Sequence, residues 1–92
     1  MFEWNELKRK SNIEKHGVDF LDAALIFDGP ILDRIDDRQN YGEVRRIAMG
    51  QVGGDIYVVT YTMRGDTIRL ISAWIGGRKE HEHYKNSITK RH

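Results

Sequence analysis

The sequence predicts a small α+β domain in which helices pack against an antiparallel sheet. In the first thirty residues, apolar side chains recur at the three- and four-residue spacing of an amphipathic helix. Between residues 31 and 75, β-branched and aromatic runs alternate with glycine-containing turns, which is typical of consecutive strands. The 92 residues suffice for one domain. The predicted order is β-α-α-β-β-β-β-α, with both early helices on one face of the sheet.

Two helices are expected near the N-terminus, after a short strand at residues 2–4. Asn5 is a favourable N-cap for a helix that ends at His16, and Gly17 is the left-handed residue expected after it. Asp19 can cap a second helix, which Gly29 and Pro30 end. The second helix carries an apolar stripe that predicts packing on the sheet: Phe20, Ala23, Ala24 and Phe27.

Four strands and a terminal helix follow. The strands are expected at residues 31–35, 43–52, 56–62 and 67–74, separated by polar or glycine-containing turns. Consecutive strands with short connections favour an antiparallel meander. Gly76 and Gly77 interrupt the last strand, and residues 78–90 are expected to form the final helix.

The composition excludes several classes of protein. Hydrophobic residues are 39% and charged residues 32% of the chain, as in ordinary globular domains. The sequence contains no membrane-length apolar run and no signal-peptide pattern, and it lacks cysteine, so we expect a cytoplasmic protein without disulfides. The net charge is +1, but residues 18–44 carry two positive and seven negative charges, whereas residues 78–92 carry five positive and two negative. The basic C-terminal segment could meet a phosphate backbone or be a solvated helix face.

No familiar cofactor motif is present. The sequence lacks a phosphate-binding loop and the glycine fingerprint of dinucleotide-binding domains. His81 and His83 would point about 200° apart on the final helix, so they cannot share one metal ion in that conformation. We therefore expect neither a metal nor another cofactor.

Several cations accompany groups that can carry protons. Arg64 is expected at a turn, Arg69 in the last strand, and the final helix carries Arg78, Lys79, Glu80 and Tyr84. Such a set suits RNA cleavage by the RNA's own 2′-hydroxyl, because cations can neutralise the phosphate while other groups move protons. Surface salt bridges are the alternative interpretation of the same residues.

Five blocks of sequence resemble one family, the BrnT toxins. The first block, W-N-E-x-K-x-x-x-N-I-x-K-H-G-V-x-F, runs from Trp4 to Phe20. The later blocks are G-E-V-R at residues 42–45, V-V-x-Y-T-x-R-G at 58–65, I-R-L-I-S-A at 68–73 and R-K-E-x-x-x-Y at 78–84. Together they span nearly the whole chain in order.

The resemblance implies a RelE-like fold and a metal-independent ribonuclease toxin of a type II toxin–antitoxin system. It also implies neutralisation by a BrnA-type ribbon-helix-helix antitoxin, with which the toxin represses its own operon and contacts operator DNA only through the antitoxin. Because such antitoxins act as dimers, a 2:2 complex is expected. By motif position, the residues for phosphate binding and proton transfer are Arg64, Arg69, Arg78 and Tyr84.

Other candidates have competing structural roles. Arg69 could instead pair with Asp33, Asp36 or Glu43 across the sheet. His16 is an eligible acid or base, but Lys15 and His16 also complement the dipole of the helix they end. Glu80 could be a base or a structural helix residue, Glu43 is a further catalytic candidate, and Lys15 and Lys79 are candidates for RNA binding.

One position departs from the family's pattern. Trp74 stands where the family usually has an arginine that could bind phosphate. Tryptophan could stack on a base but cannot neutralise a phosphate, and it could equally face the core or the antitoxin. A binding module that has lost catalysis and acts mainly as co-repressor is therefore the alternative function.

Overall fold

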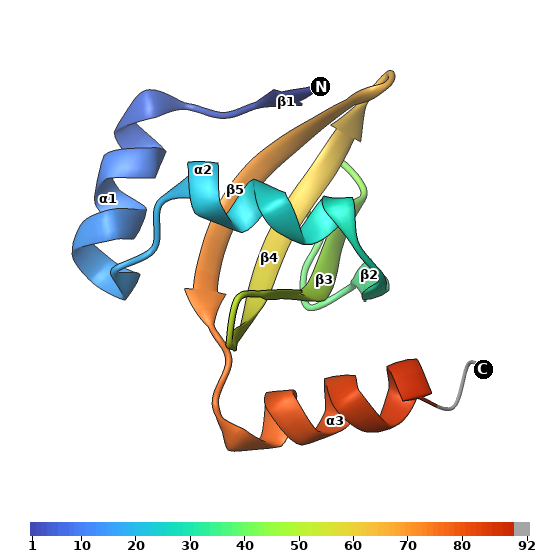
Figure 1. The fold of residues 1–92 in the computed structure, drawn as a ribbon. Coiled ribbons are helices and arrows are strands. Elements are labelled where there is room, and N and C mark those ends of the chain that lie inside the picture. Colours follow the sequence, from blue (N-terminus) through green and yellow to red (C-terminus); the bar gives the residue numbers. More distant parts are fainter. Residues whose placement is uncertain (90–92) are drawn as a thin grey trace.

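The computed structural model describes residues 1–89 and has an α+β fold, as the sequence predicts (Figure 1). The elements in chain order are β1 (Phe2–Glu3), α1 (Glu6–His16), α2 (Phe20–Ala23), the 3₁₀ helix η1 (Ala24–Asp28), β2 (Ile31–Asp36), β3 (Arg45–Val52), β4 (Asp55–Arg64), β5 (Thr67–Ile75) and α3 (Arg78–Thr89). Residue 90, the predicted end of the last helix, lies outside the described residues. No helix within residues 1–89 is long and apolar enough to span a membrane.

The sheet is mixed, which corrects the prediction of a purely antiparallel one. Its strand order is β1-β5-β4-β3-β2, and β2 to β5 form the expected antiparallel meander. However, β1 runs parallel to β5, with Phe2 beside Ile68 and Glu3 beside Arg69. A strand of two residues has too little alternation to reveal its partner or direction, so this pairing depends on the long-range path of the chain.

The caps of α1 form as predicted. The Asn5 side chain accepts hydrogen bonds from the backbone N–H groups of Leu7 (2.9 Å) and Lys8 (3.1 Å). Gly17 ends the helix with φ 69°, and its N–H donates to the carbonyl of Ile13 at 2.8 Å. These local interactions set both ends of α1 and place Lys15 and His16 in its last turn.

The second predicted helix is divided into α2 and η1. Asp19 caps α2 as expected, and hydrogen bonds from Arg9, both 2.8 Å long, lower the pKa of this carboxyl to about 2. After Ala23 the helix tightens to a 3₁₀ helix, which has three residues per turn. Ile26 is consequently turned to the same side as Ala23 and is buried, a position that the 3.6-residue stripe did not predict.

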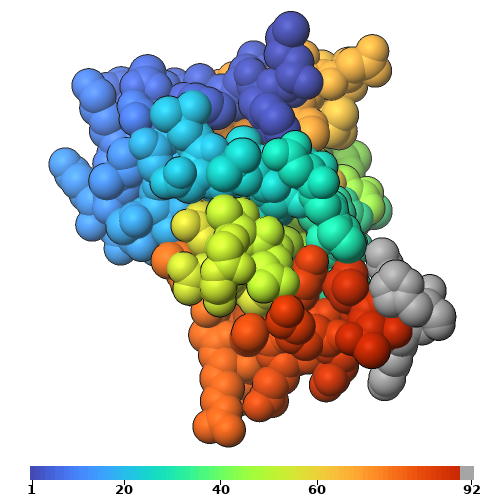
Figure 2. Space-filling view, viewed as in Figure 1, coloured from blue at the N-terminus to red at the C-terminus, as the bar shows by residue number. Residues whose placement is uncertain are grey.

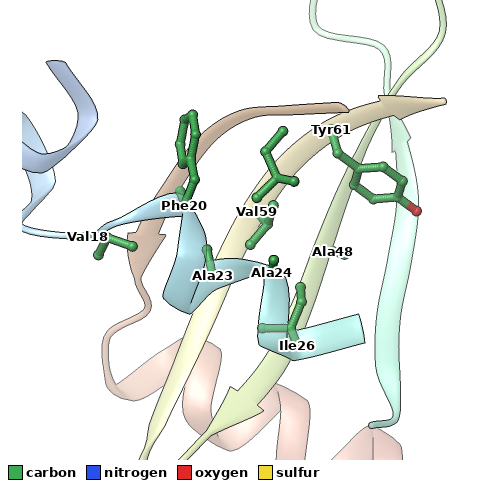
Figure 3. Close-up of a cluster of buried hydrophobic side chains, with 10 residues drawn as sticks. Val18, Phe20, Ala23, Ala24, Ile26, Ala48, Val59 and Tyr61 are labelled. Carbon is green, nitrogen blue, oxygen red and sulfur yellow. The ribbon is translucent and has the colours of Figure 1, made fainter. Parts of the chain in front are cut away.

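The core lies between α2, η1 and one face of the sheet. Val18, Phe20 and Ile26 pack on strand residues that include Val59 and Tyr61. Figure 3 shows the first three on the segment that crosses in front of the sheet, and Val59 and Tyr61 on the strand behind it. Figure 2 shows the first thirty residues over the upper part of this view, with α3 below them. The prediction that both early helices lie on one face is correct for α2 and η1, whereas α1 packs beside β5. The helix α3 packs instead against β2, β3 and β4 at one end of the sheet (Figure 1).

Buried Asn12 attaches α1 to the edge of the sheet. Its amide nitrogen donates to the carbonyls of Ala73 (2.8 Å) and Val18 (2.9 Å), and its amide oxygen accepts from the Ala73 N–H at 3.0 Å. The side chain thus hydrogen-bonds to β5 much as a neighbouring strand would, beyond the point where β1 ends. These three hydrogen bonds therefore join the middle of α1 to β5 and to the segment that follows α1.

Gly50 is required for close approach between η1 and β3. A Cβ atom at this position would lie 2.5 Å from Cβ of Ile26 and 3.2 Å from its Cα. We expect Gly50→Ala to lower the free energy of unfolding by about 1–3 kcal/mol, because the backbone of η1 must shift. Denaturant titration measures the loss. Gly54→Ala is the matched control, since its Cβ would meet nothing within 4 Å, and equal stability of both variants would contradict the prediction.

Candidate functional site

The face of the sheet opposite the core carries a groove of about 470 Å³. Strand pairing brings its floor together: Leu32 lies beside Met49, Met49 beside Val58, and Val58 beside Trp74. Arg34 and Ile47 form part of the next row of the sheet. The groove is lined by Leu32, Asp33, Arg34, Arg38, Ile47, Met49, Val58, Trp74, Glu80 and His83.

Two arginines border the groove. Arg38 is held by Asp36, with Nε and Oδ1 2.7 Å apart, and its hydrogen bonds keep the pKa of that carboxyl well below its usual range. Tyr41 donates to the same carboxylate at 3.0 Å. Arg34, by contrast, forms no ion pair with any residue between 1 and 89, so its planar guanidinium is free to bind a phosphate.

Two proton carriers reach the groove from α3. Glu80 and His83 are three residues apart, which places them on neighbouring positions of one helix face. Gly76 makes this position of Glu80 possible, because a Cβ there would lie 2.8 Å from Cβ of Glu80. The Gly76 N–H also donates to the carbonyl of Ile56 at 2.7 Å, which joins the start of α3 to β4.

Trp74 lies half-buried at the border between this groove and α1. Its ring contacts the His16 imidazole with the two centroids 6.1 Å apart. The indole also lines a second pocket, together with Lys15, His16 and Ile75. The structure thus brings Lys15 and His16 together with Trp74, although Trp74 lies far from them in the sequence. The Trp74 side chain faces the groove rather than the core.

The comparison with known families identifies the chain. The family model described as "Ribonuclease toxin, BrnT, of type II toxin-antitoxin system" matches residues 4–80. The chain belongs to the BrnT family. No curated protein matches it. Family membership confirms the resemblance seen in the sequence, and it implies that the toxin acts with an antitoxin partner.

The four residues carried over from the BrnT motifs do not meet at one site. Arg64 lies opposite Thr67 at the β4–β5 turn, whereas Ile56, which binds Gly76 beside α3, is at the other end of β4. Eight residues of strand at about 3.3 Å each separate Arg64 from Ile56 by about 26 Å. A single phosphate therefore cannot contact both Arg64 and the residues of α3.

The other motif residues have structural partners. Arg69 pairs with Glu3 at 3.5 Å, and not with Asp33, Asp36 or Glu43 as the sequence suggested. Those three carboxylates pair instead with Arg46, Arg38 and Arg45 respectively. The partner of Arg69 was missed because it depends on the parallel pairing of β1.

On α3, Tyr84 and Arg78 are turned away from the groove. Tyr84 is only 4% exposed, and its hydroxyl donates to the carbonyl of Pro30 at 2.7 Å. Arg78 has a side chain 92% exposed and lies 3.4 Å from Glu82. Lys79 is exposed and forms no ion pair within the described chain. Of the α3 candidates, only Glu80 lines the groove.

Glu43, the catalytic candidate outside α3, is exposed and pairs with Arg45 at 3.1 Å.

Sequence reasoning missed three residues of the groove: Arg34, Arg38 and His83. His83 carried a usable signal, because it follows Glu80 by three residues on a predicted helix. Nothing in the sequence indicated that Arg34 and Arg38 border the groove, because the groove forms only where α3 packs on the sheet. No group of three or more His, Asp or Glu side chains between residues 1 and 89 is arranged to hold a metal ion.

Proposed function

We propose that the chain cleaves RNA in the groove between the open sheet face and α3, without a metal ion. The observation that carries this proposal is the meeting of three side chains around one groove: Arg34, Glu80 and His83. Arg34 has no ion-pair partner among residues 1–89. An arginine, a carboxylate and an imidazole are the group types needed to neutralise a phosphate and to move two protons.

The reaction is attack by the RNA's own 2′-hydroxyl. The Glu80 carboxylate takes the hydroxyl proton as the 2′-oxygen forms a bond to phosphorus. The bond from phosphorus to the 5′-oxygen breaks, and His83 acts as the general acid that supplies a proton to that leaving oxygen. Arg34 neutralises the charge that develops on the phosphate, and Trp74 stacks on a neighbouring base. The products are a 2′,3′-cyclic phosphate and a 5′-hydroxyl end.

The test is incubation of partner-free protein with RNA in EDTA. We expect cleavage to persist, and the products to carry 2′,3′-cyclic or 3′-phosphate ends, because 2′-hydroxyl attack leaves the phosphate on that side. Gel analysis with and without phosphatase treatment distinguishes these ends. Activity that disappears in EDTA and returns with added divalent metal would exclude this mechanism. Absence of cleavage under all conditions would favour the alternative, a co-repressor without catalysis.

The proposed protein partner is an antitoxin that binds the toxin and inhibits it. A RelE-like toxin of this family would be neutralised by a BrnA-type ribbon-helix-helix antitoxin, in a 2:2 complex that represses its own operon in the cytoplasm. A stable complex would bury about 1,200–2,000 Å² in total for each toxin–antitoxin pair. Light scattering of the purified complex tests the stoichiometry, and a strict 1:1 species would contradict it.

A further inference from the structure

We infer that the surface on the α1 side of Trp74 binds the phosphates of single-stranded RNA as the strand leaves the groove. This α1 surface is formed by Lys8, Ser11, Lys15, His16 and Ser72. The inference rests on the proposed function and extends it, since it assigns a binding site for the flanking strand rather than for the scissile phosphate.

The α1 surface is hollowed and continuous with the groove. A pocket of about 220 Å³ lies between α1 and β5, lined by residues that include Lys8, Lys15 and Ser72. A second pocket shares Lys15 and His16 with it and reaches Trp74. Because Trp74 also lines the groove, a strand that passes over the indole arrives at these two pockets.

Two lysines of this surface are without an ion-pair partner in the part of the chain that the structure describes. Within residues 1–89, neither Lys8 nor Lys15 forms a salt bridge, whereas Arg9 on another face of α1 binds both Glu6 (3.0 Å) and Asp19 (2.8 Å). Seven residues at about 1.5 Å each place the two lysines about 10 Å apart along the helix. None of the described residues that line either pocket is acidic. The described lining of these pockets therefore carries positive side chains from two helical turns and no negative one.

The α1 surface also lies beside aromatic rings on which RNA bases can stack. The rings of His16 and Trp74 lie next to each other, tilted by 44°. Aromatic rings beside cations are the usual arrangement for single-stranded nucleic acid, because unstacked bases cover the rings while phosphates meet the cations. An acidic segment of a protein would use the lysines but would leave the rings without a stacking partner.

Asn12 is the positioning residue of this surface. It follows Lys8 by four residues and precedes His16 by four, and its hydrogen bonds to Ala73 and Val18 hold α1 against β5. Lys8 and Lys15 thus lie on a helix that the buried hydrogen bonds of Asn12 hold at a fixed distance from Trp74. Binding then requires little reordering of the protein backbone.

The experiment measures binding of a fluorescent twelve-residue 2′-O-methyl RNA, which has no free 2′-hydroxyl and cannot be cleaved by this reaction. Anisotropy titrations at several salt concentrations give the slope of log affinity against log salt. We expect Lys8→Gln/Lys15→Gln to reduce the size of this slope by about 1.4, because each single-strand phosphate contact contributes about 0.7. The double variant Lys10→Gln/Lys85→Gln removes two charges elsewhere and should keep the wild-type slope.

Equal slopes for the two double variants would overturn the inference. It would also be overturned if Lys8→Gln/Lys15→Gln kept wild-type RNA binding and lost binding of the antitoxin, which would assign the surface to a protein partner. Circular dichroism melting verifies that both variants fold. If the wild-type protein fails to cleave RNA in EDTA, the proposed mechanism fails, while binding of the non-cleavable RNA still decides this surface by itself.

Discussion

Glu80→Gln and His83→Gln are each expected to slow RNA cleavage by about 10²- to 10⁴-fold, the usual contribution of a general acid or base. Glutamine resembles both side chains in polarity but cannot exchange a proton at neutral pH. The measurement is the single-turnover rate with a short RNA in EDTA. Glu82→Gln is the matched control on the same helix, because Glu82 is exposed, pairs with Arg78 and does not line the groove. Wild-type rates in Glu80→Gln and His83→Gln, with folding retained, would show that the groove is not the site of cleavage.

Asn12→Ala is expected to lower the free energy of unfolding by at least about 3 kcal/mol. The change removes three hydrogen bonds at a buried site and leaves the Ala73 N–H and the carbonyls of Ala73 and Val18 without these partners. Each buried polar group that loses its hydrogen-bond partner lowers the free energy of unfolding by about 1–3 kcal/mol. Such a loss is a large fraction of the stability of a domain of this size.

Urea denaturation measures this effect. Asn86→Ala serves as the control, because Asn86 is exposed on α3 and its replacement should change stability by less than about 0.5 kcal/mol. If Asn12→Ala were as stable as the control, α1 would be held to the sheet by its apolar contacts rather than by the amide. Where the variant still folds, its RNA affinity should fall as well, since Lys8 and Lys15 would lose their position beside Trp74.

The helix boundaries and turns were predictable because their causes are local. Asn5, Gly17 and Asp19 act on backbone groups only a few residues away, and the structure confirms each role. The meander was predictable for a similar reason, since glycine-containing turns join strands that are adjacent in the chain. The family also followed from short motifs, and the match over residues 4–80 confirms it.

The parallel β1–β5 pair, the 3₁₀ turn that buries Ile26 and the partner of Arg69 came only from the tertiary structure. Each depends on packing between segments that lie far apart in the sequence. A short strand or a four-residue helix carries too few residues for its periodicity to indicate what it packs against.

The candidate site was likewise predictable from the sequence only in part. The sequence by itself determined the chemistry that the chain carries, namely arginines, lysines and proton carriers without cysteine, and it determined the family. Only the tertiary structure decided which of these residues meet. It brought Trp74, Glu80, His83 and Arg34 to one groove and separated Arg64 from α3. The physical reason is that strand register and the docking of α3 select which face and end of the sheet each side chain reaches, and both depend on contacts across the whole domain.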